Sequence, residues 1–312
     1  MTFVALEHPR TLGSLVDEHG GELDDALDVR RSIFRVGISD GYGDYDLAPV
    51  LHARGAARVS TTAPVLLVAA SIAGAVVVGR RWIHPRADLI LARLLFATEA
   101  PSFVEGAIHP SARVDERATI EPGARIGRDV VIEAGALVST SAVVYPRVHV
   151  GRDVIIGASS VIGRPGFGFV DGEPGNPAVR IPHRAGVILS EGVELGALCT
   201  VDAGVLSPTT IGAHSKLDAQ VHVGHGVVLG ARCRVAAQVG FAGSVIVEDD
   251  VFIGGQAGLA DHVRVGRGAR IAAKAGVIGD VPAGATFAGY PAVARGRWLR
   301  GHARLYRENR EK

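Results

Sequence analysis

The sequence has few aromatic residues and few cysteines, and both shortages limit what the chain can be. Phe, Trp and Tyr make up 5% of the 312 residues, although 47% are hydrophobic and 41 residues are glycine. The core must therefore consist of Val, Ile, Leu and Ala, which is typical of a solenoid of thin layers. Cys199 and Cys233 are too few for a secreted disulfide framework, so we expect a reducing compartment.

The chain also lacks a strong net charge and a convincing membrane segment. Its formal charge is +1, so no overall field selects nucleic acid or a membrane. The start, MTFVALEHPR, lacks the basic and apolar regions of a signal peptide. The uncharged run 60–79 approaches the roughly 20 residues of a membrane span. Its Pro, Gly and β-branched residues fit two buried strands around a turn better. We therefore predict no membrane span and a cytoplasmic location.

Apolar residues recur at every sixth position in two long blocks, 108–162 and 187–277. Four residues after each lies a second small residue, apart from Gly166 and Glu191. A six-residue period predicts a parallel β-helix, in which positions i and i+4 face inward and i+5 faces outward. The period resembles that of hexapeptide-repeat proteins. This resemblance implies triangular coils, each made of three hexapeptides, and a left-handed sense, against the usual crossover rule.

The repeat divides the chain into three predicted domains. Residues 1–104 mix helical patterning with apolar strands and predict a small α/β domain. Residues 105–285 form the mostly β solenoid, from which the Gly- and Pro-rich loop 163–186 projects, either as a binding loop or as a tolerated insertion. Residues 286–312 predict a basic amphipathic helix. This helix either caps the solenoid with a solvated face or binds an acidic partner.

Two histidines stand out in the run LDAQVHVGHGVVLG. His222 occupies an outward strand position and His225 a corner of the coil, so neither belongs to the core. A zinc site would need further ligands of fixed geometry. His214 and His262 are candidates, but nothing makes these side chains converge, and we expect no metal.

A circuit of three hexapeptides places distant residues in one groove. Gly243 lies one such coil after His225, and His262 lies two coils and one residue after it. A histidine beside a bare backbone N–H provides the base and the oxyanion donor that acyl transfer requires. Because no triad signature supplies a nucleophile, the simplest mechanism is direct attack by a bound amine or hydroxyl.

Several motifs resemble one particular family, the UDP-3-O-(3-hydroxyacyl)glucosamine N-acyltransferases of lipid A synthesis. The similar runs are GFGFV in the projecting loop, KLDAQVHVGHGVVLG, QVGFAGS, FIGGQAGLADHVRVG and GYPAVARGRWLR. The resemblance covers most of residues 100–300 and extends weakly to the first 100 residues. It implies transfer of a 3-hydroxyacyl chain from an acyl carrier protein thioester to the 2-amine of a UDP-glucosamine derivative.

The resemblance also implies roles for individual residues. His225 matches the catalytic base, Gly243 the oxyanion donor and His262 an assisting histidine. Asp218 matches an acidic position near the pantetheine arm. Residues that the resemblance places at the substrate or donor are Phe167 and Phe169 of the GFGFV run, Lys274 near the donor phosphate and Gly276 near the end of the groove.

The same resemblance defines cofactors and partners. It implies no tightly bound cofactor, because the acyl group arrives on the phosphopantetheine of acyl carrier protein. That protein is acidic, which gives the basic C-terminal helix a partner. Members of the family are homotrimers with sites in the clefts between subunits. No nucleic acid is expected.

The chain departs from the family pattern at several positions. Gly224 and Gly226 flank His225 where the family usually has Ala and Asn. Ala219 stands for an Asn, Ala203 for an Arg and Gly279 for a basic residue. A clear uridine-stacking run is also missing from the N-terminal domain.

These differences concern specificity, so two alternatives stay open. One is a hexapeptide N-acyltransferase that uses a short acyl-CoA on another amino sugar. The other is a non-catalytic trimeric scaffold or a metal-dependent hydratase of this fold.

Overall fold

The computed structural model describes residues 3–24, 27–37, 46–57, 59, 65–76, 80–96 and 107–308. By their contacts, the residues form two compact units. The first unit comprises residues 1–100, 168–185 and 205–207, and the second comprises residues 101–167, 186–204 and 208–312. The domain boundaries proposed from the sequence stay predictions, and each unit is described by itself.

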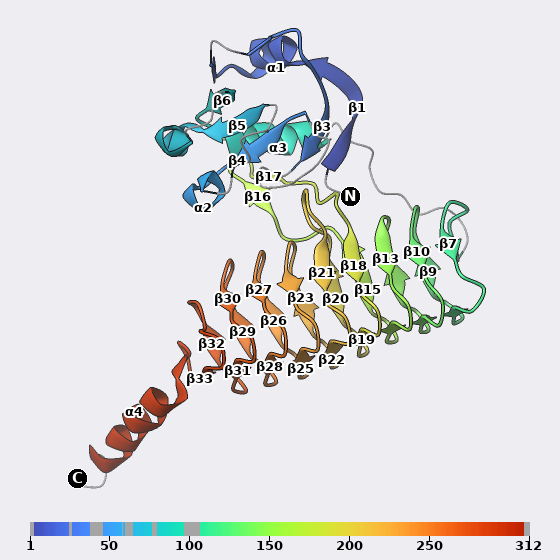
Figure 1. Cartoon of the computed structure of the whole chain (residues 1–312), viewed down its shortest axis with the longest axis vertical. Helices are drawn as coiled ribbons and strands as arrows, with labels where there is room; N and C mark the ends of the chain where they lie inside the picture. Colours follow the sequence, from blue (N-terminus) through green and yellow to red (C-terminus); the bar gives the residue numbers. More distant parts are fainter. Residues whose placement is uncertain are drawn as a thin grey trace. The chain divides into compact units, whose positions relative to one another are not determined.

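The first unit is a small α/β structure (Figure 1). Strand β1 (Phe3–Thr11) pairs antiparallel with β3 (Ser32–Gly37). A second sheet has the order β2 (Glu22–Leu23), β6 (Arg81–His84), β5 (Leu66–Ala69) and β4 (Ala48–Val50). The helices are α1 (Leu12–His19), α2 (Ala53–Ala56), the 3₁₀ helix η1 (Ala70–Ala75) and α3 (Ala87–Phe96).

Local signals in the sequence explain the two longer helices. Helix α1 begins after Thr11, whose side chain accepts a hydrogen bond from the N–H of Ser14, and it ends at Gly20 with a positive φ of 78°, as a capped helix should. Helix α3 is apolar on most of its surface and buries seven of its ten residues. Both helices lie within residues 1–104, where the sequence shows helical patterning.

The uncharged segment 60–79 begins its described part with one buried strand, β5. The turn that follows is the 3₁₀ helix η1, which is rich in alanine. Residues 60–64 and 77–79, on which the rest of the predicted strand pair falls, lie outside the described residues. No helix among the described residues has the length and apolar character needed to cross a membrane.

The insertion after residue 164 forms a hairpin within the first unit. Strands β16 (Phe169–Val170) and β17 (Val179–Arg180) pair antiparallel. Val170 is buried in a cluster with Leu89 and Ala92 of α3. Apolar burial therefore attaches this hairpin to α3, and the prediction that the segment leaves the coil is confirmed.

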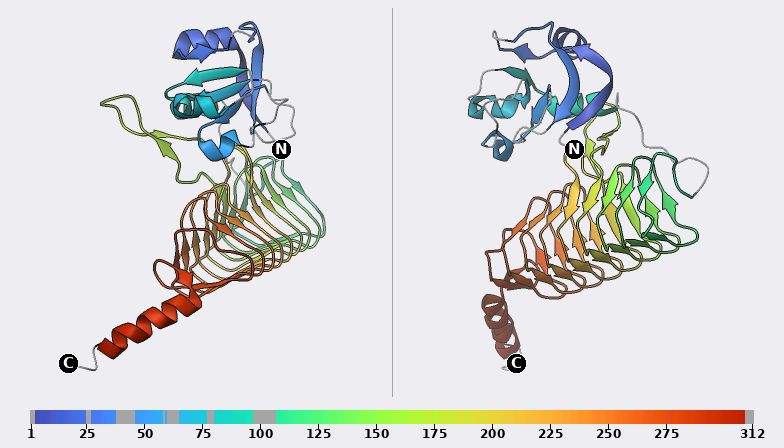
Figure 2. Two further views of the ribbon diagram at one scale, coloured as in Figure 1. Left: turned by 60° about the vertical axis from the view of Figure 1, so that its left-hand side comes forward. Right: turned by 45° about the vertical axis from the view of Figure 1, so that its right-hand side comes forward.

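The second unit is a left-handed parallel β-helix made of three sheets (Figures 1 and 2). The first sheet contains β7 (Arg113–Val114), β10 (Val131–Ile132), β13 (Val148–Val150), β18 (Val187–Leu189), β21 (Thr209–Ile211), β24 (Val228–Leu229), β27 (Ile246–Val247) and β30 (Arg264–Val265). The second sheet contains β8 (Thr119–Ile120), β11 (Leu137–Val138), β14 (Ile155–Ile156), β19 (Glu194–Leu195), β22 (Lys216–Leu217), β25 (Arg234–Val235), β28 (Phe252–Ile253), β31 (Arg270–Ile271), β33 (Thr286–Ala288) and β34 (Val293–Ala294). The third sheet contains β9 (Arg125–Ile126), β12 (Val143–Val144), β15 (Val161–Arg164), β20 (Thr200–Asp202), β23 (His222–Val223), β26 (Gly240–Phe241), β29 (Gly258–Leu259) and β32 (Gly276–Val277).

The hexapeptide pattern explains this architecture. Ile126, Val130 and Ile132 are buried while Val131 between them is partly exposed, so positions i and i+4 face inward as predicted. Val131 pairs with His149, which stands three hexapeptides later and so confirms the length of one coil. Coils stacked by hydrogen bonds in this way bury one continuous aliphatic core.

The repeat frame predicted for residues 187–205 was wrong by two positions. Leu189 pairs with Ile211, and Val201 pairs with Val223, so this coil is longer than three hexapeptides. Four extra residues enter between Val201 and Thr209, and residues 205–207 belong to the first unit. The error arose because positions i and i+4 carry the same small residue types, so a frame shifted by two still meets apolar side chains.

The second unit ends in helix α4 (Arg295–Glu308), which follows the antiparallel pair β33 and β34. Its residues from Arg295 to Arg304 are mostly exposed, and four of these ten are arginine. The rings of Trp298 and His302 lie 4.3 Å apart between centroids. A basic helix at this end of the chain was predicted, and the structure has one.

Candidate active site

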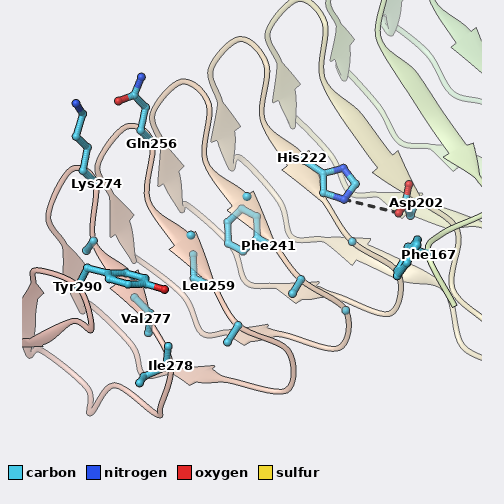
Figure 3. Close-up of a pocket in the computed structure, with 18 of the residues that line it drawn as sticks. Phe167, Asp202, His222, Phe241, Gln256, Leu259, Lys274, Val277, Ile278 and Tyr290 are labelled. Atoms are coloured by element: carbon cyan, nitrogen blue, oxygen red, sulfur yellow. Dashed lines mark ion pairs between the residues drawn. The ribbon is translucent and has the colours of Figure 1, made fainter. Parts of the chain in front are cut away.

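A groove of about 660 Å³ lies over the outward face of the third sheet, in its C-terminal coils (Figure 3). Strands β23, β26, β29 and β32 form its floor. The residues that line it are Phe167, Asp202, His222, Gly224, His225, Gly240, Phe241, Ala242, Gly243, Gln256, Gly258, Leu259, Ala260, Lys274, Ala275, Gly276, Val277, Ile278 and Tyr290. All of them belong to the second unit.

His225 and Gly243 are stacked neighbours at one corner of the coil. Their strands pair in register, His222 against Gly240, so the corner residues that follow also align. A Cβ atom added to Gly243 would lie 2.6 Å from both Cε1 and Nε2 of His225. The imidazole therefore lies directly against this backbone, which confirms the stacking predicted from the circuit of three hexapeptides. A side chain at 243 would displace the imidazole from this position.

His262 follows in the next coil. Its N–H donates a 3.1 Å hydrogen bond to the carbonyl of Gly243, and its backbone has a positive φ of 58°. It does not line the groove, so the three residues are stacked in order but only His225 and Gly243 face the cavity.

The surroundings of His225 suit a proton acceptor. Burial lowers the pKa of His225 below its ordinary value, and the nearby charge of His262 lowers it further. A hydrogen bond with the backbone of Phe167 acts in the opposite direction and weakens this shift. The imidazole is therefore neutral near pH 7, as a base must be.

The peptide N–H of Gly243 completes the pair. Within the residues that the structure describes, this N–H donates no backbone hydrogen bond, whereas those of Ala242 and Ser244 donate to Leu259 and His225. A neutral imidazole beside an unused backbone donor is an arrangement that accepts a proton and stabilises an oxyanion at one place.

The groove floor is bare beyond His222. In the outward position of successive coils stand His222, Gly240, Gly258 and Gly276, paired in register. A Cβ atom at Gly240 or Gly258 would meet nothing within 4 Å, whereas one at Gly276 would collide with the ring of Tyr290. The glycines at 240 and 258, in successive coils, therefore leave a shallow track with no floor side chain, and the ring of Tyr290 covers its far end at Gly276.

The structure brings together some of the other predicted site residues and separates two. Phe167, Lys274 and Gly276 line the groove. Asp218 is exposed at another corner, between the second and third sheets, where its carboxylate accepts from the N–H of Ala219. Phe169 belongs to the first unit, and the guanidinium of Arg180 covers its ring at 4.5 Å from the centroid.

Sequence reasoning missed a polar cluster at one end of the groove. Asp202 is buried, and its Oδ1 atom lies 2.9 Å from Nε of Arg164. Its Oδ2 atom lies 3.8 Å from Nε2 of His222, whose Nδ1 is 2.7 Å from the hydroxyl of Thr200. Burial raises the pKa of Asp202 to about 6 against the lowering effect of Arg164, and burial lowers the pKa of His222.

A correct repeat frame would have revealed part of this cluster. Thr200 pairs with His222 across the longer coil, while a regular circuit of three hexapeptides pairs His222 with Gly204. The four extra residues between Val201 and Thr209 therefore concealed the pairing.

Metal binding was the other chemistry considered for these histidines. Among the described residues, no group of three or more His, Cys, Asp or Glu side chains is arranged to hold a metal ion. His214 is exposed at a different corner, after β21 of the first sheet.

Comparisons with known proteins agree with the fold and with the resemblance. Residues 208–243 match the family model described as bacterial transferase hexapeptide (six repeats), and residues 244–278 match hexapeptide repeat of succinyl-transferase. The chain is 46% identical over 217 residues to UDP-3-O-acylglucosamine N-acyltransferase of Parasynechococcus marenigrum, covering 62% of each chain. It is 30% identical over 171 residues to the protein of the same name from Polynucleobacter asymbioticus, covering 46% of this chain and 48% of that one.

Solved structures give the same fold. LpxA from Acinetobacter baumannii superposes with a TM-score of 0.51 at 25% identity, over 64% of this chain and 78% of that chain. LpxA of Bacteroides fragilis, a UDP-N-acetylglucosamine acyltransferase, gives a TM-score of 0.50 at 21% identity, over 60% and 73% of the two chains. The chain spans between about half and three fifths of the length of the two curated relatives named above. Its solenoid is that of the hexapeptide-repeat proteins, and over that length the chain is similar to the UDP-3-O-acylglucosamine N-acyltransferases.

Proposed function

We propose that this protein is an N-acyltransferase that moves a 3-hydroxyacyl chain from acyl carrier protein to the 2-amine of a UDP-glucosamine derivative. The observation that carries the proposal is the contact between His225 and the backbone of Gly243 inside a groove with a glycine floor. The names of the two curated relatives support the same proposal, because they specify transfer of an acyl group to the amine of a UDP-3-O-acylglucosamine.

The proposed reaction uses this geometry in two steps. The amine nitrogen attacks the thioester carbon while His225 accepts the amine proton, and the carbonyl electron pair moves onto oxygen. The N–H of Gly243 stabilises that oxyanion by a charge-assisted hydrogen bond. The intermediate then collapses, the C–S bond breaks, and the thiolate receives the proton, leaving an amide and a thiol. His262 is the assisting histidine and acts by positioning, because its N–H holds the carbonyl of Gly243 while its side chain does not line the groove.

The groove also suits the proposed donor. The apolar track over Gly240 and Gly258 has room for an alkyl or pantetheine chain, because a Cβ there meets nothing within 4 Å. Lys274 lines the same groove and supplies a cation for the donor phosphate. Arg164 supplies a guanidinium at the end of the groove that we assign to the nucleotide sugar. Its backbone carbonyl accepts from the N–H of Ala203, the position at which the family has arginine, and its side chain contacts Asp202.

The proposal includes partners and an assembly. The basic helix α4 is the surface we assign to the acidic acyl carrier protein. We further propose a homotrimer, because the outward face of the first sheet carries the apolar side chains of Val131, Ile188, Val228 and Ile246. A cytoplasmic location agrees with two buried cysteines that form no disulfide.

The test offers the purified protein two donors and two acceptors. The donors are 3-hydroxyacyl-acyl carrier protein and acetyl-CoA, and the acceptors are UDP-3-O-acylglucosamine and UDP-N-acetylglucosamine, whose amine is blocked. We expect thiol release and an amide product, identified by its mass, only with the carrier protein and the free amine. Transfer from acetyl-CoA alone would favour the short-chain alternative. Thiol release by protein that contains no metal would eliminate the metal-dependent hydratase.

A further inference from the structure

Two residues of the polar cluster, Asp202 and His222, line the groove. The side chain of His222 is 43% exposed, whereas that of Asp202 is 2% exposed. Figure 3 shows them beside Phe167, away from Lys274 and Tyr290. A ligand in the groove at this end therefore meets the imidazole and not the carboxylate.

The hydrogen bonds of the cluster leave one ring nitrogen of His222 for a ligand. Nδ1 lies 2.7 Å from the hydroxyl of Thr200, which fixes the orientation of the ring. Nε2 lies 3.8 Å from Oδ2 of Asp202, which is too long for a hydrogen bond. When the hydroxyl of Thr200 donates to Nδ1, Nε2 carries the proton and donates to a ligand in the groove.

The charges of the cluster favour a neutral ligand group. Arg164 neutralises Asp202 through their 2.9 Å contact. Burial and the charge of Arg164 both lower the pKa of His222, so its imidazole is neutral near pH 7. An uncharged cluster attracts neither an ammonium nor a phosphate strongly, whereas a hydroxyl accepts a hydrogen bond from an imidazole N–H without a charge.

The two ends of the groove carry different groups. His222 is the side chain at the outward position of the first floor strand, and the next three positions are glycine. At the far end Ile278 and Tyr290 contribute apolar surface beside the cation of Lys274, which we assign to the donor phosphate. The neutral imidazole of His222 is therefore the group that suits the hydroxyls of the acceptor sugar.

We propose that His222 is a positioning residue that hydrogen-bonds a hydroxyl of the amino-sugar acceptor, with the hydroxyl of Thr200 holding the imidazole in place. The sugar then lies at the His222 end, its amine reaches His225 three residues further along the chain, and the acyl chain lies over the glycines. This inference rests on the proposed acyl transfer and adds to it which end of the groove holds the acceptor.

The test compares His222→Ala, His222→Gln and Lys216→Ala. Lys216 is the matched control, because it also occupies an outward strand position, is 51% exposed and contacts a carboxylate, that of Glu194 at 3.2 Å, on the second sheet. We expect His222→Ala to raise the KM for the acceptor about tenfold while kcat and the donor KM change little. His222→Gln should recover part of this loss, since its amide retains a donor. Lys216→Ala should match the unaltered protein.

Two acceptor analogues, lacking the 4-hydroxyl or the 6-hydroxyl, identify the bond. With one of them, the unaltered protein and His222→Ala should have the same KM, because the bond is then missing in both. If His222→Ala raised the acceptor KM by the same factor with the full acceptor and with both analogues, the inference would be wrong. A rise in the donor KM, or a kcat as low as that of His225→Ala with an unchanged acceptor KM, would also overturn it.

A binding titration separates this inference from the proposed function. If no acceptor supports thiol release, the proposed function is wrong, and calorimetric titration with UDP-glucosamine decides the inference alone. A dissociation constant that rises about tenfold in His222→Ala and not in Lys216→Ala supports the sugar site. Equal constants in the two variants, or no binding to the unaltered protein, would overturn it.

Discussion

The N-terminal and C-terminal coils of the solenoid share one core and differ in what they carry outside it. In both, Val, Ile and Leu fill the inward positions. On the outward face of the third sheet, the early coils carry Arg125, Val143 and Val161, while the late coils carry the glycines that follow His222. The inward positions must satisfy packing, so only outward and corner positions are available to differ. The N-terminal coils can therefore be supporting structure, while the C-terminal coils of the same scaffold carry the candidate active site.

The largest effect should come from the corner histidine. His225→Ala removes the proposed base, so we expect the rate of acyl transfer to fall about 10²–10⁴-fold. The melting temperature and the molar mass in light scattering should not change, because His225 lies at a partly exposed corner and not in the core. His214→Ala, at an exposed turn of the same kind, should leave the rate unaltered. A variant of His225 that keeps its full rate would remove the base from the mechanism.

A smaller effect should come from the groove floor. Gly258→Leu places a side chain where a Cβ meets nothing within 4 Å, so the fold should tolerate it while the track narrows. We expect transfer from a long-chain donor to fall about tenfold, with a smaller loss for a short-chain donor. Val161→Leu lengthens a side chain by one carbon at the equivalent outward position of an early coil and should have no effect on either donor. Equal losses in both variants would mean that stability and not the groove was affected.

The smallest effect should be a shift in pH dependence. His225 acts as a base when neutral, so activity should rise through its pKa, which burial and His262 hold below the ordinary value of 6.5. His262→Gln removes the second cause and should move the acidic limb of kcat/KM upward, by less than about one pH unit, since burial is the larger cause. If the acidic limb of the kcat/KM profile stayed in place or moved to lower pH, His262 would not be lowering the pKa of His225.

The predictable part of the candidate site is the part that the period determines. His225 and Gly243 were paired from sequence because three hexapeptides make one circuit in this region, and the structure places them in contact. Asp218 and Phe169 were assigned through short motifs alone, and the structure places them away from the groove lining. A motif gives a position along the chain, while contact depends on the wall of the coil or the unit to which that position belongs.

The sequence by itself determined the period, the inward and outward faces and the length of a regular coil, because each depends on local strand alternation. It did not determine the register across the insertions. Between Val201 and Thr209 the chain adds four residues, and only hydrogen bonds between coils decide that Thr200 lies beside His222. The tertiary structure thus created the cluster of Asp202, Arg164 and His222, since it brings together side chains whose separation in sequence follows no fixed period.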